Sequence, residues 1–406
     1  MRFTSCFLGR LTRNQLAVQA ISLCALWMVS PLKASASELV FWHKEASTKD
    51  FLEKIIKEFA TENKVSIRIE QIPVDDLKTA LLRNVEGDKL PAAVILPADF
   101  VGLYKKIKLS QVPNEWINGK IPNDALGTVQ TSGQTLGVPI LNGNHIVLYY
   151  NKKFVKNPAK TWDELISQKS QIEKQGIKLI GWNYNEGYWI AGFLGAFGGW
   201  PLTNGKISLN TKSNQEALKF YKGLSDSGLV PKDCNYDCNA KRFFDGEFAY
   251  ALNGDWAFSD VVKNLGDNLG VATIPSIGDK KVTPMFSTQA LVFPGESLKG
   301  PHSEVLKKLS SFLISAKIQD RFAIEANRIP VIKTGLETFK KISGPNQKML
   351  LTQLETARAM PSDTAMAAAW EGLRQGWRRY VSGAVEVEKA TELMQKTAEK
   401  EEKNIN

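Results

Sequence analysis

The stretch from residue 39 to residue 96 alternates short apolar runs with amphipathic segments, and this order constrains the fold more than any other feature. Residues 39–42, 65–69 and 92–96 have the apolar pattern of short strands. Residues 51–59 and 77–85 place apolar side chains on one face of a helix. This β-α-β-α-β order predicts an α/β fold with parallel strands and helices on both faces of the sheet. A ligand site would then lie beyond the carboxyl ends of the strands.

Further strands and helices follow along the rest of the chain. Residues 145–150, 248–252 and 290–293 have the pattern of strands, and the strand at 145–150 is expected to leave the first lobe. Thr161-Trp162-Asp163-Glu164 matches a capping box at a helix start, and Ser47-Thr48 can cap the first helix. A chain of 406 residues exceeds one ordinary core, so we expect two lobes joined by strands that act as a hinge.

The first residues have the composition of a signal peptide. Arg2, Arg10 and Arg13 give a positive start, residues 16–29 are largely apolar, and Ala34-Ser35-Ala36 supplies the small residues of a cleavage site. Residues 1–36 are therefore predicted to be removed, which would place the mature protein in the periplasm. A membrane anchor is the alternative, but the apolar run is shorter than a bilayer crossing requires.

The charge of the mature chain is modest. The leader holds four basic residues and no acid, so removing it lowers the net charge from +10 to 48 minus 42, or +6. The remaining lysines are interspersed with acids, whereas a nucleic-acid-binding protein concentrates its basic residues. The one dense basic cluster, residues 374–379, is expected to be the solvated face of a helix. No nucleic-acid partner is predicted.

Two of the four cysteines, Cys6 and Cys24, belong to the leader. The other two, Cys234 and Cys238, are predicted to form a small disulfide loop in an oxidising periplasm. So short a loop should shape a local turn more than it stabilises the whole fold. No second Cys or His pair accompanies them, because the only histidines are His43, His145 and His302. We therefore expect neither a metal nor a cofactor.

The sequence offers little support for catalysis. It contains no Gly-x-Ser-x-Gly, no His-Glu-x-x-His, no phosphate-binding loop and no dinucleotide fingerprint, so no catalytic residue is assigned. Aromatic residues stand beside polar ones in loop-like positions: Trp182, Tyr184, Tyr188, Trp189, Trp256 and Trp370. Flat rings beside fixed hydrogen-bonding groups suit sugars, which have apolar C–H faces and a polar rim. Each ring could instead belong to the core.

From Leu39 to about Gln395, the chain resembles the maltose/maltodextrin-binding type of extracellular solute-binding protein. The resemblance is carried by the order and spacing of several landmarks: Val40-Phe41-Trp42, Pro139 with Leu148-Tyr149-Tyr150-Asn151-Lys152, Asn157-Pro158, Lys160 to Glu164, Asn253-Gly254-Asp255-Trp256-Ala257, Met360-Pro361, and Ala369-Trp370 with Arg374. It implies a two-lobed periplasmic binding protein fold of type II. Each lobe would be a mixed sheet flanked by helices, with a ligand cleft between the lobes.

The resemblance also implies where the lobes divide and which partners the protein has. Residues 38–141 and 290–337 should form the first lobe, and residues 145–286 and 345–406 the second. The chain should cross between them near 142–144, 285–290 and 338–344. The expected function is to capture a sugar, presumed from the resemblance to be an oligosaccharide of maltodextrin type, as a monomer and deliver it to the membrane subunits of an ABC importer.

The family's functional residues map onto particular positions here. Its sugar-stacking aromatics would be Tyr188, Trp256 and Trp370. Asp99 matches a hydroxyl-binding aspartate, and Arg374 matches an arginine of the cleft. The remaining predicted ligand-binding residues are Trp42, Asn142, Asn144, Glu186 and Trp189.

The chain also departs from the family. The Asp-Lys pair after the first strand is replaced by Ala46-Ser47, the tryptophan before Asp99 becomes Leu96, and a glutamate near the hinge is replaced by the amides of Asn142-Gly143-Asn144. A sugar other than maltose is therefore possible. The two amides can donate to and accept from hydroxyls, or they can instead form a turn around Gly143.

Two alternative functions stay open. Residues 41–43 and 139–151 also resemble the glycerol-phosphate-binding relatives of this family, and Lys44 or Arg374 could then hold a phosphate. A secreted glycan hydrolase that uses Glu186 as its acid is the alternative from another class.

Overall fold

The computed structural model describes residues 38–117 and 119–406, and Glu38–Asn406 makes up one compact unit. The predicted signal peptide of residues 1–36 lies outside the described residues, so its assignment stays a prediction. Across the described ranges, no helix combines the length and the apolar character that a membrane crossing needs.

The first lobe is built on a five-stranded sheet with the strand order β2-β1-β3-β14-β6. Its strands are β1 (Leu39–His43), β2 (Ile67–Gln71), β3 (Ala93–Pro97), β6 (Val138–Leu141) and β14 (Gln289–Val292). β1 runs parallel to β2 and β3, whereas β14 runs antiparallel to β3 and β6. The parallel order predicted for the start of the chain is therefore confirmed, within a mixed sheet.

Helices cover both faces of this sheet because side chains along β1 alternate between them. Phe41 packs in one apolar cluster with α1 (Lys49–Asn63), whose buried side chains include the predicted Ile55. Trp42 packs in another cluster with Leu77 of α2 (Val74–Glu86). The helices α10 (Ser303–Leu313) and α11 (Ala316–Ala326) share the cluster of α1.

The second lobe is built on a four-stranded sheet with the order β12-β7-β11-β8. The strands are β7 (Ile146–Asn151), β8 (Lys178–Gly181), β11 (Phe248–Gly254) and β12 (Leu269–Ala272). β11 is parallel to β8, and β7 is antiparallel to both β11 and β12. This sheet is also mixed, as predicted.

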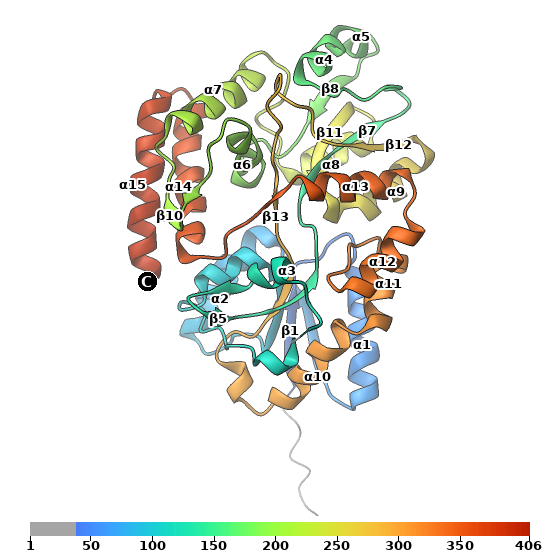
Figure 1. Cartoon of the computed structure of the whole chain (residues 1–406), viewed down its shortest axis with the longest axis vertical. Coiled ribbons are helices and arrows are strands. Elements are labelled where there is room, and N and C mark those ends of the chain that lie inside the picture. Colours follow the sequence, from blue (N-terminus) through green and yellow to red (C-terminus); the bar gives the residue numbers. More distant parts are fainter. Residues whose placement is uncertain (1–37, 118) are drawn as a thin grey trace, which may run out of the picture. The chain divides into compact units, whose positions relative to one another are not determined.

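Most of the remaining helices belong with the second sheet, and α14 and α15 run side by side there (Figure 1). These helices are α4 (Trp162–Ser167), α5 (Lys169–Glu173), α6 (Gly187–Ala196), α7 (Lys212–Asp226), α8 (Tyr236–Phe244), α9 (Phe258–Leu265), α13 (Pro345–Glu355), α14 (Thr364–Val381) and α15 (Val387–Ile405). α12 (Lys333–Ile342) packs against α11.

Shorter elements complete the described chain. The 3₁₀ turns are η1 (Ala98–Leu103), η2 (Asn114–Trp116), η3 (Asp255–Ala257), η4 (Gly266–Asn268) and η5 (Ser297–Lys299). The short helix α3 spans Asn123–Gly127. The two-residue strands pair as β4 (Gln130–Thr131) with β5 (Gln134–Thr135), β9 (Leu202–Thr203) with β10 (Lys206–Ile207), and β13 (Met285–Phe286) with β15 (Arg358–Ala359).

The two predicted helix caps differ in outcome. The hydroxyl of Thr161 accepts a hydrogen bond from the backbone N–H of Glu164, as a capping box requires, and the Glu164 carboxylate accepts from the N–H of Lys160. Thr48 precedes α1, but its hydroxyl donates to Glu45 Oε2 at 3.1 Å and does not cap the helix. The prediction of a side-chain cap at α1 is therefore wrong, because Thr48 has φ −118° and ψ 20°, outside the extended region typical of an N-cap residue.

Three segments connect the two sheets: the link from β6 to β7, the link from β13 to β14, and the turn between α12 and α13. One apolar cluster also joins the lobes near these links, because it contains Tyr149 of β7 together with Ala323 of α11 and Phe339 of α12. We propose that these three segments are the hinge, and the lobe boundaries given above stay a proposal.

Candidate functional site

Tyr188, Trp256 and Trp370 come from three separate elements of the second lobe and meet in one place. The centroid of the Tyr188 ring lies 6.0 Å from that of Trp256 and 6.1 Å from that of Trp370. All three side chains are half-buried, so part of each remains accessible. We call these three residues the aromatic cluster.

Local sequence explains how the three rings meet. Tyr188 stands in the first turn of α6, and a Cβ on Gly187 would lie 3.3 Å from the ring of Trp370, so the glycine allows a close approach. Trp256 follows the carboxyl end of β11, the edge of the sheet where side chains reach a ligand site.

The small residues before Trp370 serve helix packing. Ala367 and Ala368 pack in the core of the first lobe, and Ala369 packs in the core of the second. A Cβ on Gly102 would lie 3.0 Å from the Cβ of Ala367, which shows how closely α14 approaches η1. Small side chains beside Trp370 could leave room for a ligand at its ring, but those of Ala367 and Ala368 instead fill the contact between α14 and the first lobe.

Asp99 brings a carboxyl group of the first lobe to the aromatic cluster. It is the second residue of η1, which directly follows β3, and its Oδ2 accepts a hydrogen bond from the indole N–H of Trp370 at 3.1 Å. Burial raises the pKa of Asp99 to about 7, although the Trp370 N–H lowers it, and the charges of Glu186 and Lys44 act in opposite directions. Near neutral pH this carboxyl group can therefore either accept or donate a hydrogen bond.

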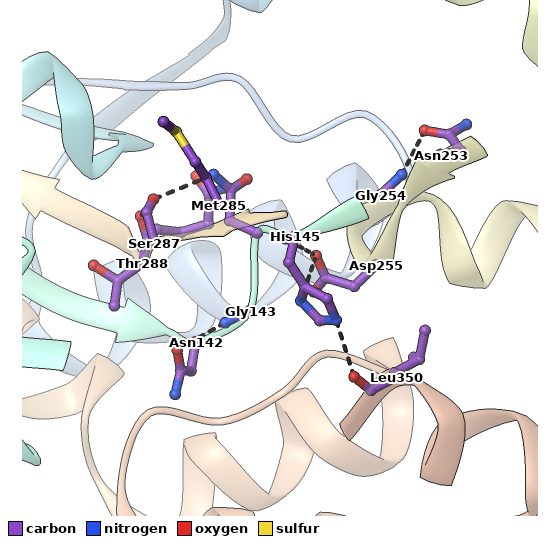
Figure 2. Close-up of polar contacts among 12 residues, drawn as sticks. Asn142, Gly143, His145, Asn253, Gly254, Asp255, Met285, Ser287, Thr288 and Leu350 are labelled. Atoms are coloured by element: carbon purple, nitrogen blue, oxygen red, sulfur yellow. Dashed lines mark hydrogen bonds and ion pairs between the residues drawn. The ribbon is translucent and has the colours of Figure 1, made fainter. Parts of the chain in front are cut away.

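Asn142 and Asn144 lie in the link between β6 and β7. Figure 2 shows Asn142 beside Gly143 in this link. Asn142 Oδ1 accepts from the backbone N–H of Gly143 at 2.8 Å. Asn144 Nδ2 donates to Ser287 Oγ at 3.2 Å, and its Oδ1 accepts from Gln289 Nε2 at 2.9 Å. Both amides thus make local contacts within the hinge segments. Their role in ligand binding stays a prediction.

The hydroxyl of Tyr188 connects the aromatic cluster to the same link. It donates to the backbone carbonyl of Asn144 and lies 3.3 Å from that of Met285. The aromatic cluster is therefore tied to two of the segments that join the lobes.

A buried His–Asp contact at the same link was not predicted from the sequence. Asp255 Oδ1 accepts from the backbone N–H of His145 at 3.0 Å, and His145 Nε2 lies 2.9 Å from the carbonyl oxygen of Leu350 (Figure 2). Burial lowers the pKa of His145, so the ring is neutral, and Nε2 must carry the hydrogen because a carbonyl only accepts. Gly143 has φ +104°, and a Cβ there would lie 2.5 Å from Asp255 Oδ2. The sequence feature that could have indicated Asp255 is its position directly before Trp256, a predicted ligand-binding residue.

Glu186 and Arg374 lie at the margin of the aromatic cluster. Glu186 is the residue that precedes α6, and although its side chain reaches solvent, desolvation and the charge of Asp75 raise its pKa. The charge of Arg374 opposes this increase. Arg374 itself forms a two-point contact with Glu371, with Nε 2.9 Å from Oε2 and Nη2 2.5 Å from Oε1.

The other predicted rings are buried. Trp42 is 5% exposed in the core of the first lobe, and Trp189 is 4% exposed and donates its indole N–H to the carbonyl of Leu252 at 3.0 Å. Trp189 packs behind Trp256, with ring centroids 6.0 Å apart. Contact of Trp42 or Trp189 with a ligand stays a prediction. Trp182 and Tyr184 lie in the loop after β8, as the sequence predicted, but their side chains are buried in the core of the second lobe and do not face a ligand.

A buried ion cluster beside Asp99 could not be predicted from the sequence, because its members Glu45 and Arg328 lie 283 positions apart. Glu45 Oε2 is 2.7 Å from Arg328 Nη1, and Glu45 Oε1 is 3.1 Å from Lys44 Nζ. Burial alone would raise the pKa of Glu45, but the charges of Lys44 and Arg328 outweigh it and lower the pKa to about 2. Arg328 is 1% exposed, so this ion pair lies inside the protein.

The predicted disulfide lies at the start of α8. The sulfur atoms of Cys234 and Cys238 are 1.95 Å apart, which is bonding distance. Within the described residues, no group of three or more His, Cys, Asp or Glu side chains could hold a metal ion.

Comparison with known proteins defines the class of this chain. It belongs to the bacterial extracellular solute-binding protein family, whose model matches residues 54–341. The fold and the resemblance predicted from the sequence are therefore confirmed.

Particular relatives refine this assignment. The chain is 24% identical to the maltotriose-binding protein of Pyrococcus abyssi (strain GE5 / Orsay) over 358 residues, which cover 84% of this chain and 77% of the relative. It is 22% identical to the maltodextrin-binding protein MdxE of Bacillus subtilis (strain 168) over 387 residues, which cover 89% and 91%. Its structure is similar to that of the maltose/maltodextrin-binding domain MalE from Bdellovibrio bacteriovorus bound to maltotriose. That comparison has a TM-score of 0.82 and 25% identity, and it covers 89% of this chain and 99% of that one.

Proposed function

We propose that this protein captures a maltodextrin, with maltotriose as the reference ligand, and delivers it to the membrane subunits of an ABC importer. One observation carries the proposal: the half-buried rings of Tyr188, Trp256 and Trp370 gather on the second lobe against the Asp99 carboxyl of the first. The names of the relatives, which bind maltotriose and maltodextrin, support the same class of ligand.

The chemistry of the site suits a neutral sugar. Ring faces pack against the C–H faces of pyranose units, and a carboxyl group within hydrogen-bonding reach accepts from hydroxyls. In this proposal the sugar takes over the contact that Trp370 makes with Asp99. Trp189 would support the site from behind, because it is almost fully buried and packs against Trp256.

A phosphorylated ligand is disfavoured by the pairing of the available cations. Lys44 lies against Glu45, and Arg374 holds Glu371 at two points. Asp99 and Glu186 add negative charge beside them when they are ionised. A phosphate would therefore have to compete with carboxylates already bound to both of the cations considered for it.

Catalysis is disfavoured for a related reason. A glycosidase needs one protonated carboxyl group and a second that is ionised as base or nucleophile. Burial raises the pKa of Asp99 to about 7, and desolvation also raises the pKa of Glu186, so both pKa values move in the same direction and neither carboxyl group is shifted toward the ionised form. We propose a binding protein without enzymatic activity.

Ligand binding should close the lobes, because Asp99 and the aromatic cluster belong to different lobes. Closure is then a population shift driven by contacts that both lobes make with the sugar. We further propose that the protein acts as a monomer in the periplasm after removal of residues 1–36.

Calorimetric titration of the purified protein with maltotriose tests the proposal, with cellotriose and glycerol 3-phosphate as comparison ligands. Maltotriose should bind and the comparison ligands should bind much more weakly. A preference for glycerol 3-phosphate would contradict the sugar assignment. Chromatography of maltotriose after long incubation should show no shorter sugar, and cleavage products would contradict the binding-protein assignment.

A further inference from the structure

Trp256 is held from behind by a residue that lies between the two cysteines. Its indole N–H donates to the hydroxyl of Tyr236 at 3.1 Å. Tyr236 is the first residue of α8, and Cys234 and Cys238 flank it at equal distances along the chain. The residue that orients a ring of the aromatic cluster therefore lies inside the short loop that Cys234 and Cys238 close.

The rest of this loop is fixed to the second lobe by two asparagines. Asn235 Oδ1 caps α8 by accepting from the backbone N–H of Cys238 at 3.0 Å. Asn239 Nδ2 lies 2.7 Å from the carbonyl of Cys234 and 2.7 Å from that of Trp182. Trp182 directly follows β8, so the loop is attached to the edge of the sheet.

The Tyr236 side chain has further contacts that favour one orientation. Its ring centroid lies 6.4 Å from that of Trp189, which packs at 89° against Trp256. Burial raises the pKa of Tyr236, so the hydroxyl stays protonated and keeps its hydrogen-bonding capacity at any physiological pH. Trp256 is thus fixed at its edge by Tyr236 while part of the ring stays exposed.

Losing this bond would leave the orientation of the half-buried Trp256 ring set only by its packing against Tyr188 and Trp189, and would let its side-chain torsions vary more widely. A ligand would then have to fix the ring on binding, which reduces affinity because ordering a side chain costs free energy. A preoriented ring avoids that cost.

We propose that Tyr236 is a positioning residue for Trp256, and that the disulfide between Cys234 and Cys238 holds Tyr236 in place. The redox state of the two cysteines then sets the affinity of the protein for the sugar. The inference rests on the proposed function, because it treats Trp256 as a ligand-binding ring. Reduction would require a dithiol, which passes two electrons and two protons to Cys234 and Cys238 and is itself oxidised to a disulfide.

The variant Tyr236→Phe tests the first part, with Tyr221→Phe as its matched control. Tyr221 accepts the indole N–H of Trp182 at 2.7 Å in the core, so the control removes the same kind of bond away from the aromatic cluster. Tyr236→Phe should weaken maltotriose binding by about 3- to 10-fold, the range expected for one neutral hydrogen bond. Tyr221→Phe should lower the melting temperature and leave the affinity unchanged.

Two further measurements separate positioning from a general loss of structure. In sugar-free protein, the NMR signal of the Trp256 indole N–H, identified by its absence in Trp256→Phe, should shift and exchange faster with solvent in Tyr236→Phe. In the Trp256→Phe background, Tyr236→Phe should cost no further affinity. An unchanged indole signal, or an equal loss of affinity in both backgrounds, would overturn the positioning role.

The double variant Cys234→Ser/Cys238→Ser and treatment of the unaltered protein with dithiothreitol test the second part. Both should weaken maltotriose binding and shift the Trp256 indole signal in the same direction, and dithiothreitol should not affect the double variant. Equal affinity and an equal indole signal in the oxidised and reduced forms would overturn the role of the cysteines. If the protein does not bind maltotriose at all, the proposed function fails, whereas the indole signal still tests the positioning.

Discussion

Replacing Trp256 with alanine separates a ligand-binding ring from a core ring, and Trp189 provides the matched control. The two indoles touch, with ring centroids 6.0 Å apart, yet Trp256 is half-buried and Trp189 is only 4% exposed. Trp256 donates to a side chain, the hydroxyl of Tyr236, whereas Trp189 donates to the backbone carbonyl of Leu252. The same substitution at neighbouring positions should therefore have different consequences.

The magnitudes follow from burial and contact type. If Trp256 packs against a sugar ring, Trp256→Ala should cost about 1–3 kcal/mol of binding free energy, from the lost aromatic contact and apolar area. That is a drop in affinity of about 5- to 150-fold. Because the ring is half-buried, the loss in free energy of unfolding should stay below the ~3–5 kcal/mol typical of a core tryptophan. Trp189→Ala should reach that range.

Calorimetry with maltotriose and urea unfolding of both variants give the two quantities side by side. Trp256→Ala should lose mainly affinity, and Trp189→Ala should lose mainly stability. If Trp256→Ala keeps its affinity while its free energy of unfolding collapses, Trp256 is a core residue and not a ligand-binding ring.

Three other predictions concern the first lobe and the cysteines. Burial raises the pKa of Asp99 to about 7, so the stability that this group contributes below its ordinary pKa of 3.8 should be lost as the pH rises through about 7. Asp99→Asn should make the melting temperature less dependent on pH over that range, and an unchanged dependence on pH would count against the buried carboxyl group. Arg328→Met removes one of the two cations that contact the buried Glu45 and should cost about 3–5 kcal/mol in urea unfolding. Glu45→Leu/Arg328→Met should cost less, and a more severe loss in the double variant would contradict the ion pair. Exported protein that is denatured without reductant should react with no thiol reagent, and two reactive thiols would show that Cys234 and Cys238 are not joined.

Much of the fold could be predicted because it depends on local patterns. The alternation in residues 39–96 specified parallel strands with helices on both faces, and the structure has β1 between β2 and β3 in that arrangement. Boundaries shifted by one or two residues, as β2 shows by beginning at Ile67. The apolar pattern of a strand does not determine the residue at which its hydrogen bonding begins, so the predicted boundaries differ slightly from those of the structure.

The site was harder to predict because burial is a property of the whole fold. Trp182 and Trp256 have similar polar neighbours in the sequence, yet Trp182 is 1% exposed in the core and Trp256 is half-buried. Ala367 and Ala368 lie beside Trp370 in sequence, but they pack on the other lobe.

Ion pairs between residues far apart in the chain could not be predicted from the sequence. Arg328 and Glu45 meet only because α11 ends near the carboxyl end of β1, and neither residue is unusual in its own segment. Asp99 and Trp370, 271 positions apart, were both assigned through the family resemblance, and their direct hydrogen bond required the structure.

A crystal structure of the protein with bound maltotriose tests the central claim most directly. The account predicts density for the sugar between the Asp99 carboxyl group and the rings of Tyr188, Trp256 and Trp370, with the Trp370–Asp99 hydrogen bond replaced by bonds to sugar hydroxyls. Maltotriose bound elsewhere, with this hydrogen bond intact and the three rings free of ligand, would contradict it.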